Sequence, residues 1–110
     1  MNLLTRHCTP AAAALATPAV TALLAQTPGW TAAGGKLART FDFANYYQTI
    51  AFVNALAWVA HRQDHHPELT VNYHTCAVTF STHSAGGAVT ENDFICAALA
   101  DALYAARPGP

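Results

Sequence analysis

The residues best suited to chemistry are three histidines, two of them adjacent in the chain. His65 and His66 lie between Asp64 and Pro67, and His83 follows at a distance. Histidine has an ordinary pKa of about 6.5, so it can give and take protons near neutral pH. A neighbouring carboxylate can orient an imidazole or raise its pKa. The pattern predicts an acid/base cluster without a nucleophile.

The elements around these histidines indicate how they could meet. Residues 69–74 and 76–82 alternate between apolar or β-branched and polar side chains, which predicts two strands of a hairpin. If these strands are neighbours, the end of the second returns to the start of the first, so His83 should lie beside His66. Asp93 is expected in the first turn of the last helix, where it could orient an imidazole.

The remaining pattern predicts a helix from residue 17 to about 26, a hairpin over 30–43 with a two-glycine turn, a helix at 45–63 and a helix after Thr90. Pro67 disfavours helical backbone at His66, so the long helix should end just before the histidine pair. The expected fold is α+β: a four-stranded, mainly antiparallel sheet with three helices on one face, in the order α-β-β-α-β-β-α.

Length and composition indicate one soluble domain. The chain has 110 residues, 53% of them hydrophobic and 10% charged. We expect a domain at 17–106, a flexible N-terminal tail at 1–16 and a C-terminal tail at 107–110. The apolar composition leaves surface for a partner subunit, which favours a homo-oligomer. The net charge of −1 argues against nucleic acid as a partner, and no apolar run is long enough for a membrane span or a signal peptide.

Alternatives to a histidine catalyst are a structural role and a metal site. A single histidine such as His7 or His74 is more often a surface residue than a catalyst. His61 and His65 have the i, i+4 spacing that zinc accepts, but the glutamate of an H-E-x-x-H motif is missing. Three cysteines at wide spacings suit neither a disulfide framework nor a zinc ribbon and favour a reducing cytoplasm. We therefore expect no metal.

Several motifs together make the chain recognisable. The segment 64–68, Tyr73, the pair Thr82-His83 and the segment 90–94 resemble the active-site pattern of the pterin-4a-carbinolamine dehydratase family, also called the dimerisation cofactor family. Segments 28–30, 34–41 and 51–54 look like the same family, and the resemblance covers about residues 18–104. The family fold, a four-stranded sheet backed by three helices, agrees with the order of elements expected from the pattern.

The resemblance implies a hydro-lyase that dehydrates 4a-hydroxytetrahydropterin to quinonoid dihydropterin, in the recycling of the pterin used by aromatic amino acid hydroxylases. Because the pterin is the substrate, the resemblance implies no metal or organic cofactor. It also implies a homodimer or homotetramer. The catalytic residues would be His65, His66 and His83, with His66 the principal acid/base group. Supporting residues would be Asp64, Asp93 and His61, and substrate-binding residues Pro67, Tyr73 and Thr82.

The chain also departs from the family in two places. Glu68 is followed by Leu69, where many members have tryptophan, and the loop after His83 is one residue longer than in some relatives. Some members bind other proteins instead, as coactivators of a homeodomain transcription factor or as RuBisCO assembly factors. The motif tends to be degraded in those assembly factors and is intact here, which favours the enzyme over a non-catalytic module on the same fold.

Overall fold

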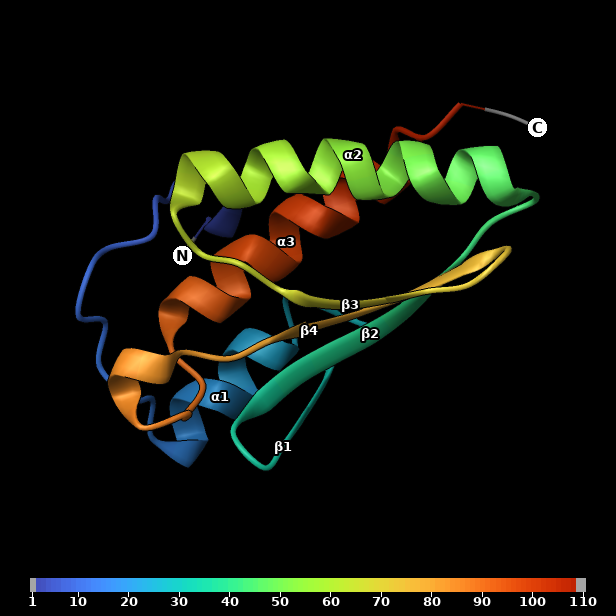
Figure 1. The fold of residues 1–110 in the computed structure, drawn as a ribbon. Coiled ribbons are helices and arrows are strands. Elements are labelled where there is room, and N and C mark those ends of the chain that lie inside the picture. Colours follow the sequence, from blue (N-terminus) through green and yellow to red (C-terminus); the bar gives the residue numbers. More distant parts are fainter. Residues whose placement is uncertain (1, 109–110) are drawn as a thin grey trace.

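The computed structural model of the chain describes residues 2–108 (Figure 1). The helices are α1 (Thr17–Leu24), α2 (Tyr46–Gln63) and α3 (Glu91–Ala105), and the single-turn 3-10 helices are η1 (Leu3–Thr5) and η2 (His83–Ala85). The strands are β1 (Thr31–Ala33), β2 (Lys36–Asp42), β3 (Glu68–Val71) and β4 (Thr75–Phe80).

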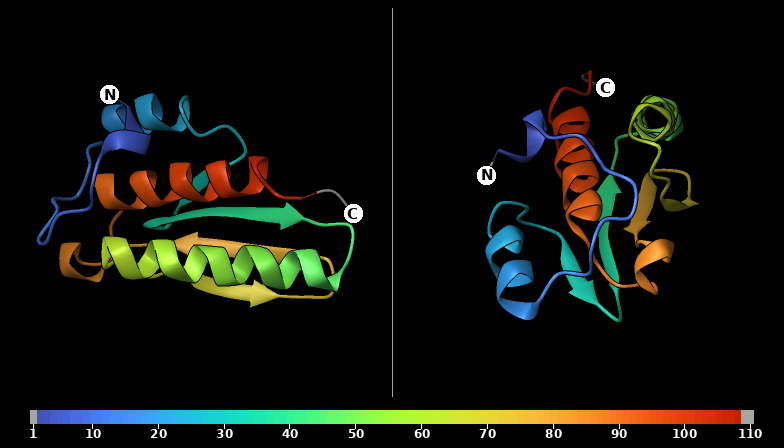
Figure 2. Two further views of the ribbon diagram at one scale, coloured as in Figure 1. Left: turned by 90° about the horizontal axis from the view of Figure 1, so that it is seen from above. Right: turned by 90° about the vertical axis from the view of Figure 1, so that its left-hand side faces the viewer.

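The strands within residues 2–108 form one antiparallel sheet in the order β1-β2-β4-β3. Both predicted hairpins are present, and β4 lies between β2 and β3. Figure 2 shows α1, α2 and α3 on the same side of this sheet. The predicted α+β fold and its order of elements are therefore confirmed.

Local sequence signals explain the limits of the two long helices. The side chain of Asn45 accepts a hydrogen bond from the backbone N–H of Gln48 and starts α2. Asp64, in left-handed conformation with φ of 50°, ends α2 directly before the histidine pair. A capping box between Thr90 and Asp93 starts α3.

The strands of the second hairpin are shorter than predicted. The backbone N–H of Asn72 donates to the carbonyl of Thr75, so a turn takes residues that alternation had assigned to a strand. β4 ends at Phe80, and Thr82 makes only an isolated bridge to Ala88. His83 was expected to close the strand, but it begins the 3-10 helix η2 instead.

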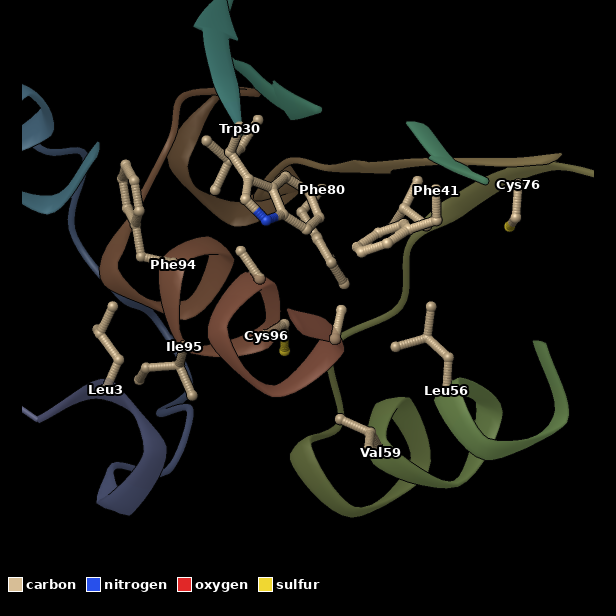
Figure 3. Close-up of a cluster of buried hydrophobic side chains, with 14 of the residues drawn as sticks. Leu3, Trp30, Phe41, Leu56, Val59, Cys76, Phe80, Phe94, Ile95 and Cys96 are labelled. Carbon is tan, nitrogen blue, oxygen red and sulfur yellow. The ribbon is translucent and has the colours of Figure 1, made fainter. Parts of the chain in front are cut away.

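The hydrophobic core lies between the sheet and the helices. Side chains of α2 and α3 meet those of β2 and β4, and the largest are aromatic (Figure 3). Burial of this apolar surface is the main term that holds the layers together, at about 25 cal/mol per Å². Core residues with almost no exposure include Leu37, Phe41, Leu56, Val78, Phe80, Phe94 and Ile95.

Residues before α1, predicted as a tail, contact the rest of the fold. Leu3 is buried, and the backbone N–H of Leu15 donates to the carbonyl of Val89. At the other end, Pro108 accepts a hydrogen bond from Gln48, and residues 109–110 lie outside the described part. The limits of the domain stay a prediction. Across residues 2–108, no helix combines the length and apolarity that crossing a membrane requires.

Candidate active site

A pocket of about 330 Å³ lies at the end of the molecule where α2 ends, η2 sits and α3 begins (Figure 1). His65, His66 and His83 all line it, together with Asp64 and Thr82. The pairing of Glu68 with Thr79 shows why, since it brings the residues after β4 back beside the residues before β3. The predicted meeting of the three imidazoles is thus observed, while their catalytic roles are not tested by it.

His65 is held by a buried carboxylate. Its Nε2 lies 2.6 Å from Oδ1 of Asp93, a side chain with no solvent exposure. Because a carboxylate accepts, Nε2 carries the proton and donates it. This hydrogen bond, together with the negative charge of Asp93, raises the pKa of His65 above its ordinary value, although burial opposes the rise. His65 is therefore a stronger base than an ordinary histidine.

Asp93 is itself fixed by two further hydrogen-bond donors. Its Oδ2 accepts from the hydroxyl of Thr82 at 3.0 Å and from the backbone N–H of Thr90 at 2.8 Å. The hydroxyl of Thr90 lies 2.8 Å from that of Thr82 and must donate to it, because the proton of Thr82 is already used. The helix cap and the histidine anchor are therefore one network, and Thr82 belongs to it.

The other contacts of His65 within residues 2–108 leave one of its two ring nitrogens without a hydrogen-bond partner. Its ring stacks on Phe80, with centroids 5.9 Å apart and planes inclined by 12°. Its backbone N–H donates to the carbonyl of Ala60. No partner for Nδ1 occurs among residues 2–108. Nδ1 is thus the atom through which His65 can act on a ligand.

His66 and His83 differ from His65 in being exposed. No side-chain hydrogen bond to either ring occurs in the described part of the chain. Their backbones are placed by the left-handed turn at Asp64 and by η2, respectively. The pocket therefore combines one fixed imidazole with two that can reorient around a ligand.

Four residues from the predicted set do not line the pocket, and one of them, Asp93, is connected to it through its hydrogen bond with His65. Pro67 follows His66 without reaching the cavity. The ring of His61 is exposed and lies against Trp58, with centroids 5.9 Å apart. Tyr73 lies in the β3–β4 turn at the far end of the sheet, 66% exposed and stacked on Tyr46. Sequence order could not show this, because β3 carries Tyr73 away from the histidine pair.

The N-terminal segment supplies one wall of the pocket, which the sequence did not indicate. Thr9, Pro10 and Ala11 line it. The side chain of Asn92 accepts from the backbone N–H of Thr9 at 3.0 Å and donates to its carbonyl at 2.8 Å. Thr9, Pro10 and Ala11 carry no charge or aromatic ring and no periodicity, so the only signal was Asn92 inside the recognised 90–94 motif.

The β1–β2 turn also contacts the loop that follows His83. Gly35, in the β1–β2 turn, has φ of 76°, and a Cβ added there would lie 2.1 Å from the carbonyl oxygen of Gly87. Gly87 belongs to the turn that follows η2 and His83. The two turns can approach this closely only because residue 35 has no side chain.

A metal site would require several ligand side chains close together. Within residues 2–108, no three side chains of histidine, cysteine, aspartate or glutamate are grouped so that they could hold a metal ion. A larger cavity of about 560 Å³ lies near Asp42, Tyr104 and Arg107, and no histidine lines it. The histidine pocket is the better candidate for acid/base chemistry.

Comparison with known proteins gives a consistent result. The family model for pterin 4 alpha carbinolamine dehydratase matches residues 13–103. The chain is 48% identical to a protein of Nitrosospira multiformis over 94% of this chain and 93% of that one, and 52% identical to one of Chromobacterium violaceum over 94% and 97%. Both relatives are provisionally named pterin-4-alpha-carbinolamine dehydratase.

Two solved structures are also similar. A transcriptional coactivator/pterin dehydratase from Brucella melitensis superposes with a TM-score of 0.78 and 29% identity, covering 82% of this chain and 97% of that one. A pterin dehydratase-like protein described as a RuBisCO assembly factor in the alpha-carboxysome gives a TM-score of 0.57 and 28% identity, covering 68% and 86%. From the match over residues 13–103 and these identities, the chain belongs to the pterin 4 alpha carbinolamine dehydratase family.

Proposed function

We propose that this protein is a hydro-lyase that removes water from 4a-hydroxytetrahydropterin and yields quinonoid dihydropterin. The observation that carries the proposal is the convergence of His65, His66 and His83 on one pocket in a chain of this family. A cavity of about 330 Å³ falls in the usual range for small-molecule sites, roughly 300–1,000 Å³. Protons can be exchanged there near neutral pH without a metal.

The reaction needs one proton delivered and one removed. In the proposed mechanism His66 protonates the 4a-hydroxyl, the C4a–O bond breaks, and water leaves. The proton on N5 passes to a second imidazole as the C=N bond forms, so the atoms balance. Nδ1 of His65, oriented by Asp93, and the ring of His83 are the groups that share this second transfer and hold the pterin.

The proposed reaction also sets requirements for the cofactor, the supporting residues, the source of the substrate and the compartment. The pterin is the substrate and no further cofactor is required, since proton transfer is the whole chemistry. Thr82 fixes Asp93, and Asp64 adds negative charge at the mouth of the pocket. A functional link to an aromatic amino acid hydroxylase would supply the substrate. The three free thiols suit a reducing cytoplasm.

A steady-state assay tests the proposal. Carbinolamine generated in place by a hydroxylase absorbs in the ultraviolet, and the purified protein should accelerate loss of that signal. His66→Ala should reduce the acceleration by roughly 10²- to 10⁴-fold, the usual contribution of a general acid or base. His74→Ala is the matched control, because His74 is exposed and lies outside the pocket. An unchanged rate in His66→Ala would overturn the role of His66.

The second candidate is a protein-binding module on the same fold. The two similar structures, one of a protein described as a coactivator and pterin dehydratase and one of a RuBisCO assembly factor, favour it. Large aromatic side chains on α2 are exposed, among them Tyr47 at 82% and Trp58 at 65%, which also favours a homodimer or homotetramer. Light scattering of Tyr47→Lys and Trp58→Lys against the native protein measures the oligomer. A protein that forms complexes but does not accelerate carbinolamine loss would support the module over the enzyme.

A further inference from the structure

Two cysteines far apart in the sequence lie side by side next to the histidine pocket. The sulfur of Cys8, in the N-terminal segment, is 3.6 Å from the sulfur of Cys96 in α3. Cys96 is fully buried among core side chains (Figure 3), whereas Cys8 is half-buried. Both thiols are free.

The surroundings of the pair make the two thiols unequal. The thiol of Cys8 donates to the backbone carbonyl of Asn92, so the thiol of Cys96 is left to donate to the sulfur of Cys8. This hydrogen bond from Cys96 lowers the pKa of Cys8 below its ordinary value, against burial and the negative charges of Asp93 and Glu91. The positive charge of His65 acts in the same direction. The same hydrogen bond and its own burial raise the pKa of Cys96. Cys8 is thus the thiol that ionises and reacts first, and Cys96 the one that follows.

The backbone at Cys8 is held by a hydrogen bond from its N–H to the side chain of Gln63 and not by a helix or strand. A disulfide has an S–S length of about 2.05 Å, so the sulfurs, now 3.6 Å apart, must move closer together by about 1.5 Å. Residues 6–16 contain no helix or strand, while Cys96 is fixed inside α3. The movement therefore falls on the segment that carries Cys8.

We propose that Cys8 and Cys96 are a redox-modification site that a peroxide converts to a reversible disulfide. The Cys8 thiolate attacks one peroxide oxygen, the O–O bond breaks, and the departing hydroxide takes a proton to become water. The sulfur of Cys96 then attacks the sulfur of the Cys8 sulfenic acid, the S–O bond breaks, and a second water leaves with the Cys96 proton. Two thiols lose two electrons, one peroxide is reduced, and a dithiol reverses the reaction.

The disulfide would fix one wall of the pocket. Thr9, Pro10 and Ala11 follow Cys8 directly and line the cavity, and Asn92 of α3 holds Thr9 by two hydrogen bonds. A covalent link at residue 8 would add to these bonds and to the salt bridge between Arg6 and Glu91. Oxidation should therefore restrict the motion of this wall, whatever ligand the pocket takes.

Mild oxidation of the full chain tests the site without any pterin. One equivalent of hydrogen peroxide should leave one free thiol of the three, reduce the intact mass by two hydrogen atoms, and give a linked peptide pair containing Cys8 and Cys96. Cys76 should remain the free thiol, because it is buried in β4 and burial raises its pKa. A dithiol should restore all three thiols.

Two variants make the result specific. Cys8→Ser should keep both of its remaining thiols under the same treatment, and Cys76→Ser should form the disulfide as the native chain does. Amide hydrogen exchange at Thr9 and Ala11 should slow on oxidation of the native protein and stay unchanged in Cys8→Ser. Retention of three thiols, oxidation of Cys8 to the sulfinic acid, or a disulfide between two chains would each overturn the inference.

Discussion

The two ends of the sheet are built on different interactions. At one end, Phe41 lies 4.8 Å from Phe52 and 4.9 Å from Tyr104 between ring centroids, and Phe43 lies 5.2 Å from Phe52. At the other end, the central contact is a buried carboxylate, Asp93, surrounded by hydrogen-bond donors. The first end is held by non-directional burial and the second by directional polar contacts.

This difference separates stability from the orientation of groups. Aromatic packing contributes through the area removed from water and tolerates small rotations of the rings. The network around Asp93 contributes less per contact, since a typical hydrogen bond adds about 0.5–1.5 kcal/mol net, but it holds His65 in one direction. Substitutions at the two ends should therefore fail in different ways.

The largest expected effect is on stability at the aromatic end. Phe52→Ala should lower the free energy of unfolding by about 3–5 kcal/mol, because a fully buried ring is replaced by a cavity. Denaturant unfolding measures it, with Tyr47→Ala as the exposed aromatic control, expected within about 0.5 kcal/mol. If Phe52→Ala lowers the free energy of unfolding as little as Tyr47→Ala does, the aromatic end is not held by burial of its rings.

Next in size is the loss of orientation at the pocket. Asp93→Asn keeps the shape but removes the charge that holds His65, so we expect about 10²-fold lower kcat and a changed pH profile of kcat/KM. The exposed Asp64→Asn is the control and should change kcat much less. If the profile of Asp93→Asn matches that of the native protein, Asp93 acts only as a helix cap.

A smaller effect is expected at the N-terminal wall. Asn92→Ala removes the two hydrogen bonds to Thr9, worth about 0.5–1.5 kcal/mol each, so KM for the pterin should rise roughly three- to tenfold with kcat nearly unchanged. Gln63→Ala, which loses the bonds to the backbone of Cys8 and to the ring of His7 but none to Thr9, should show a weaker rise. Steady-state kinetics separates the two parameters, and a fall in kcat alone would contradict a positioning wall.

The smallest effect is the pH dependence of stability. The folded state raises the pKa of His65, so its pairing with Asp93 contributes fully below the ordinary pKa of about 6.5. That contribution is lost as pH rises from there through the higher folded-state pKa. Unfolding free energies measured across this range should fall with pH, and His65→Gln should flatten the trend. A native curve that rises over the same range would refute the pairing.

Much of the pocket could be predicted because it follows from strand pairing. Alternation in residues 69–82 indicated an antiparallel hairpin, and its geometry alone returns His83 to His66. The capping spacing from Thr90 to Asp93 likewise placed the carboxylate at the start of α3. Local periodicity and capping rules were enough for these residues.

The remaining features depend on contacts that leave no local pattern. Thr9 is held by Asn92, and Cys8 by Cys96, across almost the whole chain. Tyr73 fits the family motif in sequence order but lies at the aromatic end, because β3 runs away from the pocket. Spacing along the sequence does not indicate how far apart two side chains lie in space when a strand separates them.

The close approach of Gly35 to Gly87 ties the shape of the loop after His83 to a hairpin that contributes no residue to the pocket. Any side chain at residue 35 would push the turn at Gly87 away from the β1–β2 turn and would displace His83, which precedes that turn. Residue 35, which contributes nothing to the pocket lining, therefore limits the position of the loop that carries His83, so a substitution there would reshape the pocket without changing any residue that lines it.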